Sequence, residues 1–534
     1  MSCRLLLSVA AIALTAGAAH AEYRLHILHI NDLHSRIESI NKYDSTCDAE
    51  GEEKGECFGG IARVASKIRE LRDGLKAEGE NVVVLDAGDQ YQGSLFYSTY
   101  KGKDTVEFMN AIGFDAMAVG NHEFDDGPEG LALLASGVKF PVISGNLDLS
   151  QSNVLKDIVG DKLVLEVGDQ KIGIISALAM DTPETSSPGK SVIFKDDLDS
   201  LKADAAALAD EGVNKVIALT HEGYKRDQVI AAEVPGVDVV VGGHSHTLLS
   251  NDDEAAEGPY PTMVNGSDGV GVPVVQAYAY GKYLGHLVVT FDDEGKVIKA
   301  EGQPILLDAS VTPDEKMLAR ITEMAKPIEE LKTRIVANTT AEIGADRTEC
   351  RAKECQMGSL VADAMLDRVR NQGIQIAIQN GGGLRAAIDA GPVSMGEVIS
   401  VLPFQNTLST FWLSGAGVVT ALENGASQME EGAGRFAQVA GLKYTVDPAA
   451  APGQRISDVM VADGEQWVPI DPAAEYGVVS NNYMRGGGDG YAVFANEARK
   501  AYDFGPDLAD VLAEYLAKKG PDFVAKTDGR ITVK

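Results

Sequence analysis

Five short apolar segments of β-strand character each lead into side chains that can bind metals. In chain order the clusters are Asn31-Asp32-Leu33-His34, Asp89, Asn121-His122-Glu123, His221-Glu222 and His244-Ser245-His246. The carboxyl ends of strands in a parallel α/β sheet lie along one edge, where ligands bind. We therefore expect these side chains to converge in space. Imidazole, carboxylate and amide groups together suit Zn²⁺ or Mn²⁺, and there are enough of them for two ions.

The order of secondary-structure patterns predicts an α/β protein of at least two domains. Residues 23–300 alternate strand-like and helix-like stretches, including a predicted helix over 61–75. A chain of 534 residues is longer than a single hydrophobic core usually supports. A second α/β domain is predicted over 336–534, with a helix at 357–370 followed by a strand that ends near Gln379.

A long amphipathic helix is predicted between the two domains. Thr312 has the character of an N-cap, Pro313 suits the first helical position, and the apolar pattern continues to about Lys332. We interpret residues 312–335 as a linker helix between a first domain, 22–311, and the second, 336–534. The alternative is a helix that belongs to one domain.

The N-terminus has the pattern of an export signal. Arg4 precedes an apolar run over 5–18, and Ala19-His20-Ala21 fits a cleavage site, so residues 1–21 are predicted to be removed. The alternative is a membrane anchor, but the run is shorter than the ~20 residues that span a bilayer. We expect a protein without a stable membrane anchor, in a periplasm or outside the cell.

The remaining cysteines form two close pairs, Cys47 with Cys57 and Cys350 with Cys355. Even, local pairing in an exported chain predicts two disulfides. The alternatives are four free thiols, or one zinc site made of all four, although neither pair has C-x₂-C spacing. The formal net charge of −32 argues against nucleic-acid polymers and anionic membranes as main partners.

Each polar cluster is ambiguous alone. The sequence Asp32-x-His34 would place two side chains on one face of a strand, but this pattern is common. Gly88-Asp89 is more often a turn with an acidic residue, whereas adjacent Asn121 and His122 after an apolar strand are more specific, because buried polar groups need partners. The order and placement of all the clusters are more informative than any one.

Taken together, these motifs resemble the calcineurin-like metallophosphoesterases, and the second half of the chain resembles the C-terminal domain of the 5'-nucleotidase family. The resemblance covers essentially the whole mature chain. It implies an N-terminal domain of four layers, a β-sandwich between helices, that carries a dinuclear metal site. It also implies a second α/β domain that binds the substrate.

The resemblance also implies a ligand for each metal position. The first ion would be held by Asp32, His34, Asp89 and His246. The second would be held by Asp89, Asn121, His221 and His244, with Asp89 bridging the two. The ions would be Zn²⁺ or Mn²⁺, with Co²⁺ a third candidate, and a hydroxide bridging them would attack phosphorus in line. At the position of His246 many family members carry Gln or Asn, so we expect the first metal to be held firmly here.

The resemblance assigns His122 to stabilising a phosphoryl oxygen or the leaving group. Asp125 would orient this imidazole and favour its charged form. The alternative for Asp125 is an acidic residue at a helix N-terminus. The other mature histidines, His26, His29 and His286, lie inside strand-like runs and are predicted to be packed groups rather than ligands.

Substrate residues are implied in the second domain. The segment Asn380-Gly381-Gly382-Gly383-Leu384-Arg385 is similar to the family's NGGGIR motif. The remaining matches are Phe404 and Tyr483 for the two aromatics that sandwich the base, Asp489 for ribose hydroxyls and Arg351 for phosphate. Without the resemblance, both aromatics would be assigned to the core.

The resemblance implies a metal-dependent 5'-nucleotidase that acts on a small nucleotide, as a monomer or homodimer. Hydrolysis of a phosphoanhydride such as UDP-sugar, NAD or ATP is the nearest alternative, followed by 2',3'-cyclic phosphodiesterase and 3'-nucleotidase activity. A sulfur-oxidising relative with two manganese ions is disfavoured, because the nucleotide residues are present. A catalytically silent binding protein would have lost a ligand or His122, and all are present.

Overall fold

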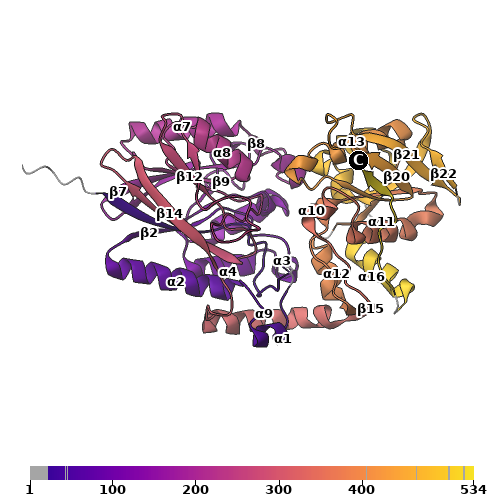
Figure 1. Ribbon diagram of the computed structural model, residues 1–534, viewed down its shortest axis with the longest axis horizontal. Coiled ribbons are helices and arrows are strands. Elements are labelled where there is room, and N and C mark those ends of the chain that lie inside the picture. The colour runs from indigo at the N-terminus through magenta and orange to yellow at the C-terminus, as the bar shows by residue number, and fades with distance from the viewer. Residues whose placement is uncertain are drawn as a thin grey trace, which may run out of the picture.

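The computed structural model describes residues 22–534 apart from 43, 45, 405, 465, 503–505 and 521–522. The predicted signal segment, residues 1–21, lies outside the described residues. Figure 1 shows two bodies side by side, the first coloured indigo to magenta and the second orange to yellow. No helix in the described part of the chain is both long enough and apolar enough to cross a membrane.

Two six-stranded sheets form the first body. The strands of the first sheet, in spatial order, are β14 (Val297–Leu306), β13 (Tyr283–Phe291), β1 (Tyr23–Ile30), β2 (Asn81–Asp86), β3 (Ala116–Ala118) and β4 (Val142–Ile143). The second contains β11 (Thr262–Asn265), β12 (Gly271–Val275), β10 (Val239–Val241), β9 (Val216–His221), β7 (Gln170–Leu178) and β6 (Lys162–Val167). The runs β1–β4 and β7–β9–β10–β12 are parallel, so their carboxyl ends are collected at one edge of each sheet.

The sheets pack face to face, which explains why their central strands are apolar along their length. Ile27, Leu85, Ile174, Leu219 and Val239 are buried in one cluster between them, and strands covered on both faces read as continuous apolar runs. Outside the first sheet lie α2 (Ile61–Glu78), α4 (Lys103–Ile112) and α5 (Gly127–Gly137). Outside the second lie α7 (Asp197–Asp210) and α8 (Tyr224–Glu233). The predicted four-layer sandwich is confirmed.

The predicted linker helix exists but begins later than the sequence indicated. Helix α9 spans Glu315–Thr333, and its N-cap is Asp314, whose side chain accepts a hydrogen bond from Met317 N at 2.8 Å. The prediction of Thr312 as N-cap was wrong. Asp314 is an equally good capping residue, and its second oxygen pairs with Arg69 on α2 at 2.6 Å.

The apolar face of α9 packs on the first body. Met317, Ile321, Met324 and Ile328 are buried in the same core as the helices of the first sheet. The helix also contacts α12 (Met395–Val401) of the second body, and Figure 1 shows it running beneath both. It is therefore a packed element of the first body as well as the connection, while the boundary 312–335 remains a prediction.

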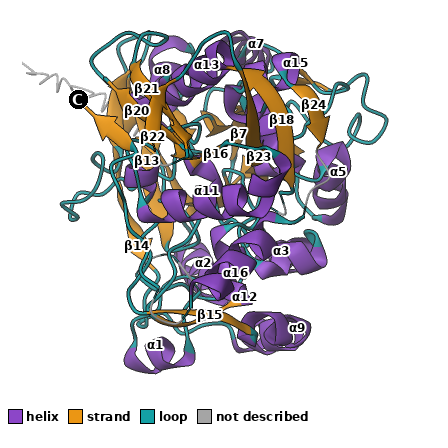
Figure 2. Ribbon diagram, turned by 90° about the vertical axis from the view of Figure 1, so that its right-hand side faces the viewer, coloured by secondary structure: helices purple, strands orange, loops and turns teal. Residues whose placement is uncertain are grey.

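The second body is built on a five-stranded sheet, shown with its helices in Figure 2. In spatial order its strands are β19 (Ala437–Ala440), β16 (Ile376–Asn380), β23 (Glu475–Asn481), β18 (Leu408–Ser414) and β24 (Arg499–Tyr502). Helices α11 (Gln356–Val369) and α16 (Leu508–Lys519) share one core with this sheet. Helix α13 (Gly415–Ala426) and a second sheet of β22 (Gln466–Pro469), β21 (Ile456–Asp463), β20 (Leu442–Val446) and β25 (Ile531–Val533) share another.

Both predicted disulfides are present. Cys47 is bonded to Cys57, beside the short helix α1 (Ala49–Lys54), and Cys350 is bonded to Cys355. The second bond connects α10 (Arg347–Cys350) to the start of α11, so it fixes the turn that carries Arg351.

Candidate metal and nucleotide site

The polar clusters meet where the parallel strands of both sheets end. In the first sheet, β1 leads to Asp32 and His34, β2 leads to Asp89, and β3 leads to Asn121. In the second sheet, β9 ends at His221, and β10 leads to His244 and His246. Asp32, His34 and His246 place ligand atoms within 4.8 Å of one another, and so do Asp89, His221 and His244. Asn121 Oδ1 lies 2.9 Å from His244 Nδ1. All seven residues proposed as ligands are therefore brought together.

The prediction that Asp32 and His34 share one face of a strand was wrong. β1 ends at Ile30, and both residues follow it with positive φ, 52° and 49°. Asp89, His244 and His246 also have positive φ. This conformation is unfavourable for residues with a β-carbon and recurs at functional sites. The side chains converge through tight turns beyond the strands rather than through strand alternation.

Further contacts hold the candidate ligands. His221 Nδ1 bonds to Ala87 O at 2.6 Å, which directs Nε2 towards Asp89 Oδ2, 3.1 Å away. Asp32 accepts from His244 N and from Asn31 Nδ2. Glu123 accepts backbone hydrogen bonds from Gly120 and Asp89, and thereby joins two of the turns. Such outer contacts orient metal ligands. Asn31 and Glu123 belong to the polar clusters of the sequence, but no pattern there indicated this orienting role.

Burial sets the charge of these groups. It lowers the pKa values of His34 and His246 well below the usual value and that of His244 to about 3. It raises the pKa of Asp32 to about 6. For Asp89 and His221 burial opposes charge, but their mutual attraction outweighs it, so the carboxylate pKa is lowered and the imidazole pKa raised. The three neutral imidazoles are ready to bind a divalent cation, whereas His221 must first lose its proton.

The spacing of the donor atoms fits bound cations. His34 Nε2 and His246 Nε2 face each other at 2.9 Å, and two ligand atoms on one tetrahedral cation are about 3 Å apart. Both residues are buried. The residues present therefore fit two divalent metal ions.

His122 lies at the edge of this centre. It begins the short helix η1 (His122–Phe124), and its Nδ1 is 2.7 Å from Asp125 Oδ2. Burial works against the charged imidazole, but Asp125 and Asp89 outweigh it, so the pKa of His122 is raised. The geometry fits a proton donor oriented by a carboxylate.

The second body presents its candidate substrate residues to the same place. The ring of Phe404 lies 5.9 Å from that of His122, and the Arg385 guanidinium lies 5.7 Å from the centre of the Phe404 ring. Arg351 is buried, and its Nη1 donates to Gly432 O. Arg385 acts electrostatically on His34 and His122, so a phosphate at the metal centre would lie within reach of its charge.

Asp489 lies in the turn η5 (Gly488–Gly490) and has a positive φ of 54°. One carboxylate oxygen accepts from Asn380 Nδ2 at 2.6 Å and the other from the Tyr483 hydroxyl at 3.1 Å. Tyr483 is half-buried on α14 (Asn482–Arg485). Asn380, Tyr483 and Asp489 thus form one hydrogen-bonded group.

Two residues near the site were missed in the sequence. Arg347 starts α10, four residues before Arg351, and its charge acts on Asp32, His244 and His246. The i, i+4 spacing of the two arginines was the available signal. Ser186 donates to Asp125 Oδ1 at 2.8 Å across 61 positions of sequence, and no local pattern indicates it.

The remaining histidines are packed, as predicted. His26 Nδ1 and His286 Nε2 are 2.9 Å apart, and His29 Nε2 lies 2.8 Å from the Tyr260 hydroxyl.

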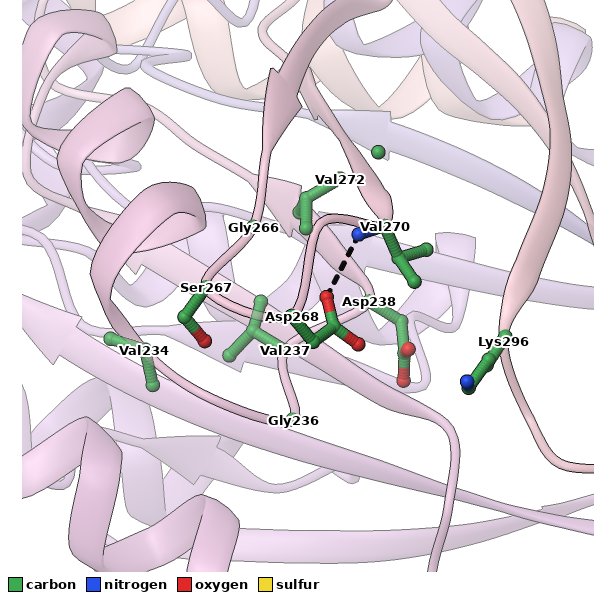
Figure 3. Close-up of a pocket in the computed structure, with 11 residues that line it drawn as sticks. Val234, Gly236, Val237, Asp238, Gly266, Ser267, Asp268, Val270, Val272 and Lys296 are labelled. Atoms are coloured by element: carbon green, nitrogen blue, oxygen red, sulfur yellow. Dashed lines mark hydrogen bonds between the residues drawn. The ribbon is translucent and has the colours of Figure 1, made fainter.

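A small pocket lies elsewhere on the first body (Figure 3), between the segment that precedes β10 and the turn that leads into β12. Asp238, Asp268 and Lys296 line it, and it contains no predicted site residue.

Comparison with known proteins tests the resemblance. Residues 25–248 match the calcineurin-like phosphoesterase family, and residues 335–496 match the 5'-nucleotidase C-terminal domain. The 5'-nucleotidase of Homo sapiens is 37% identical over 549 residues, which cover 99% of this chain and 93% of that protein. The chain belongs to the 5'-nucleotidase family. Its buried His and Asp clusters are those of a metal-dependent hydrolase of this family and are consistent with a dinuclear site.

Solved structures of the 5'-nucleotidase family agree in fold. A 5'-nucleotidase precursor from Thermus thermophilus superposes with a TM-score of 0.89 at 38% identity, covering 96% of this chain and 99% of that one. The NAD nucleotidase of Haemophilus influenzae is 29% identical with a TM-score of 0.59, covering 96% and 99%. The predicted α/β fold class and family are confirmed.

Proposed function

We propose that this member of the family hydrolyses nucleoside 5'-monophosphates to nucleoside and phosphate, at two divalent metal ions. The observation that carries the proposal is that residues suited to bind metal ions lie beside residues suited to bind a nucleotide. Candidate metal ligands of the first body lie next to candidate nucleotide residues of the second, with the His122 and Phe404 rings 5.9 Å apart.

In this proposal the ions are held by Asp32, His34, Asp89 and His246 and by Asp89, Asn121, His221 and His244. When bound, they supply Lewis acidity and lower the pKa of a coordinated water. Of the candidate metals, Zn²⁺ and Mn²⁺ are favoured over Co²⁺.

The other residues bind the substrate and move a proton. Arg351 and Arg385 neutralise phosphate oxygens. Phe404 and Tyr483 take the base by stacking, which tolerates any base, and Asp489 accepts from ribose hydroxyls. His122 Nδ1 is engaged by Asp125, so Nε2 is the nitrogen that serves the phosphoryl oxygen or the leaving group.

The second candidate function is hydrolysis of a phosphoanhydride such as NAD, UDP-sugar or ATP. It is favoured by the similarity to the Haemophilus influenzae NAD nucleotidase over nearly the full length of both chains. It uses the same metal centre and differs in which phosphorus is attacked.

We also propose a cellular compartment and an oligomeric state for the enzyme. Two disulfides in the folded chain support export to an oxidising compartment. We propose the periplasm, with the extracellular space as the alternative, and a monomer or homodimer that acts on free nucleotides.

The test is phosphate release from AMP by the purified protein, with and without EDTA and added Zn²⁺, Mn²⁺ or Co²⁺. UDP-glucose, NAD, ATP and 2',3'-cyclic AMP are assayed in parallel. We expect chelator-sensitive release that is fastest from AMP and is lost in His122→Ala. Faster hydrolysis of the anhydrides would move the function to the second candidate, and no hydrolysis with any metal would overturn both.

A further inference from the structure

Asp125 accepts hydrogen bonds from two side chains. Its Oδ2 faces His122 Nδ1 at 2.7 Å, and its Oδ1 accepts from the Ser186 hydroxyl at 2.8 Å. A carboxylate held through one oxygen can still rotate about its Cβ–Cγ bond. A second donor on the other oxygen fixes the plane of the group, and with it the direction in which Asp125 holds the imidazole.

Ser186 is supplied by a well-anchored loop. It follows α6 (Thr182–Thr185), and its backbone N–H donates to Thr182 O at 2.9 Å. Thr182 is fully buried, and its hydroxyl donates to Ala179 O just beyond the end of β7. The backbone of Ser186 is extended (φ −154°, ψ −160°), which any residue adopts, so the serine is not required by the local backbone.

The same loop lies against the second body. Helix α6 packs on the turn η5, which carries Asp489. Asp125 also acts electrostatically on Tyr483. Ser186 therefore belongs to an element that touches both Asp125, the partner of the candidate proton donor, and the turn that carries Asp489.

We propose that Ser186 is a positioning residue for the His122–Asp125 pair: its hydroxyl fixes the Asp125 carboxylate and so aims His122 at the substrate. The inference rests on the proposed function of His122 and Asp125. Ser186 itself does not touch the reacting atoms. If Ser186 only stabilised its loop, Ser186→Ala would lower the stability of the fold. Its effect on kcat would then be the same with and without the Asp125 carboxylate.

The experiment is a double-mutant cycle of Ser186→Ala and Asp125→Ala, with steady-state kinetics on AMP at saturating metal. Ser186→Ala is expected to lower kcat about tenfold, the size of one hydrogen bond to a charged group, with KM changed by less than about twofold and the same melting temperature and metal content as the wild type. In the Asp125→Ala background the same substitution is expected to change kcat by less than about twofold, because the acceptor of the Ser186 hydrogen bond is gone.

Two further variants complete the design. Ser186→Thr keeps the hydroxyl and suits an extended backbone, so it is expected to retain wild-type kcat. Ser187→Ala removes an exposed neighbouring hydroxyl and is expected to have no effect. If Ser186→Ala does not fold, Ser186→Cys, a weaker donor of similar size, is compared in its place.

Three results would overturn the proposal: a Ser186→Ala enzyme with at least half of wild-type kcat, an equal loss with and without the Asp125 carboxylate, or no rescue by threonine. Failure of the proposed function looks different. In that case the wild-type enzyme itself would fail to release phosphate from AMP. If only the roles of His122 and Asp125 are wrong, Asp125→Ala and His122→Ala would leave AMP hydrolysis unchanged.

Discussion

At the scale of single residues, the candidate metal centre is built largely from residues in an unfavourable backbone conformation. Asp32, His34, Asp89, His244 and His246 all have positive φ, which costs residues with a β-carbon about 1–2 kcal/mol each. The surrounding hydrogen bonds must hold these turns in place before a metal arrives. The site is therefore preorganised by the fold, and the fold gives up some stability for it.

One residue-scale prediction concerns His246. Its Nε2 faces His34 Nε2 and lies 3.2 Å from Asp32 Oδ1. An imidazole binds zinc-like ions more tightly than an amide oxygen does. We expect His246→Gln to lose one metal equivalent about tenfold faster during dialysis against a weak chelator, because loss even of a group that only orients a ligand lowers metal affinity by about tenfold or more. Metal content measured by elemental analysis checks this, and equal retention in both proteins would refute it.

A second residue-scale prediction concerns the pH dependence of stability. Burial, with the nearby charges of His26 and Arg24, lowers the pKa of His286 to about 4, whereas in an unfolded chain it is about 6.5. The neutral ring therefore contributes stability that is complete above pH 6.5 and is lost as the pH falls through 4. We expect His286→Phe to reduce the fall in melting temperature between pH 7 and pH 4.

The control for this prediction is Lys299→Gln, an exposed charge on the neighbouring strand β14. It should leave the pH profile unchanged. The titratable groups near His286 are His26, His29 and Arg24, with Glu80 beyond His26. A His286→Phe protein with the wild-type pH profile would show that His286 titrates normally.

At the scale of elements, two residues were candidates for the N-cap of α9, and their substitution tests which one caps the helix. Asp314 caps the helix and pairs with Arg69, whereas Thr312 precedes it. We expect Asp314→Ala to lower the free energy of unfolding by about 1 kcal/mol, the usual value of an N-cap. Thr312→Ala should change it by less than about 0.5 kcal/mol. Urea unfolding of both variants checks this, and a larger effect of Thr312→Ala would restore the sequence-based assignment.

The elements also show what a sequence can predict. Apolar strands followed by polar clusters predicted where the candidate ligands would meet, because parallel strands must end at a common edge. The resemblance to the family then selected the seven ligands from these clusters. The sequence could not predict how the side chains converge, because the left-handed turns at Asp32 and His34 depend on contacts with other strands. Nor could it predict the bond between Ser186 and Asp125, which exists only after β7 and η1 are folded together.

At the scale of the whole molecule, the proposed site closes between two bodies. Lys225 on α8 donates to Glu430 O of the second body at 3.2 Å, and α6 packs on η5. We expect a nucleoside held between these surfaces to leave when they separate, and such opening often limits turnover. A reversible crosslink between cysteines at positions 225 and 430 should therefore lower kcat about tenfold or more.

Reduction of the crosslink should restore the activity of the uncrosslinked double variant, which serves as the control. Measurement of kcat before and after reduction checks the prediction. Undiminished turnover in the crosslinked protein would show that hydrolysis and release need no separation of the two bodies.

The division of the site between two bodies has a consequence for how such enzymes change. The candidate metal ligands all lie before residue 247, and the candidate nucleotide residues all lie after residue 350. Substitutions that alter which base or sugar is accepted can therefore accumulate in one half of the gene while the other half, with its bond-breaking chemistry, is inherited unchanged. A two-body scaffold of this kind allows the substrate specificity of related enzymes to change while the residues that carry out the reaction stay the same.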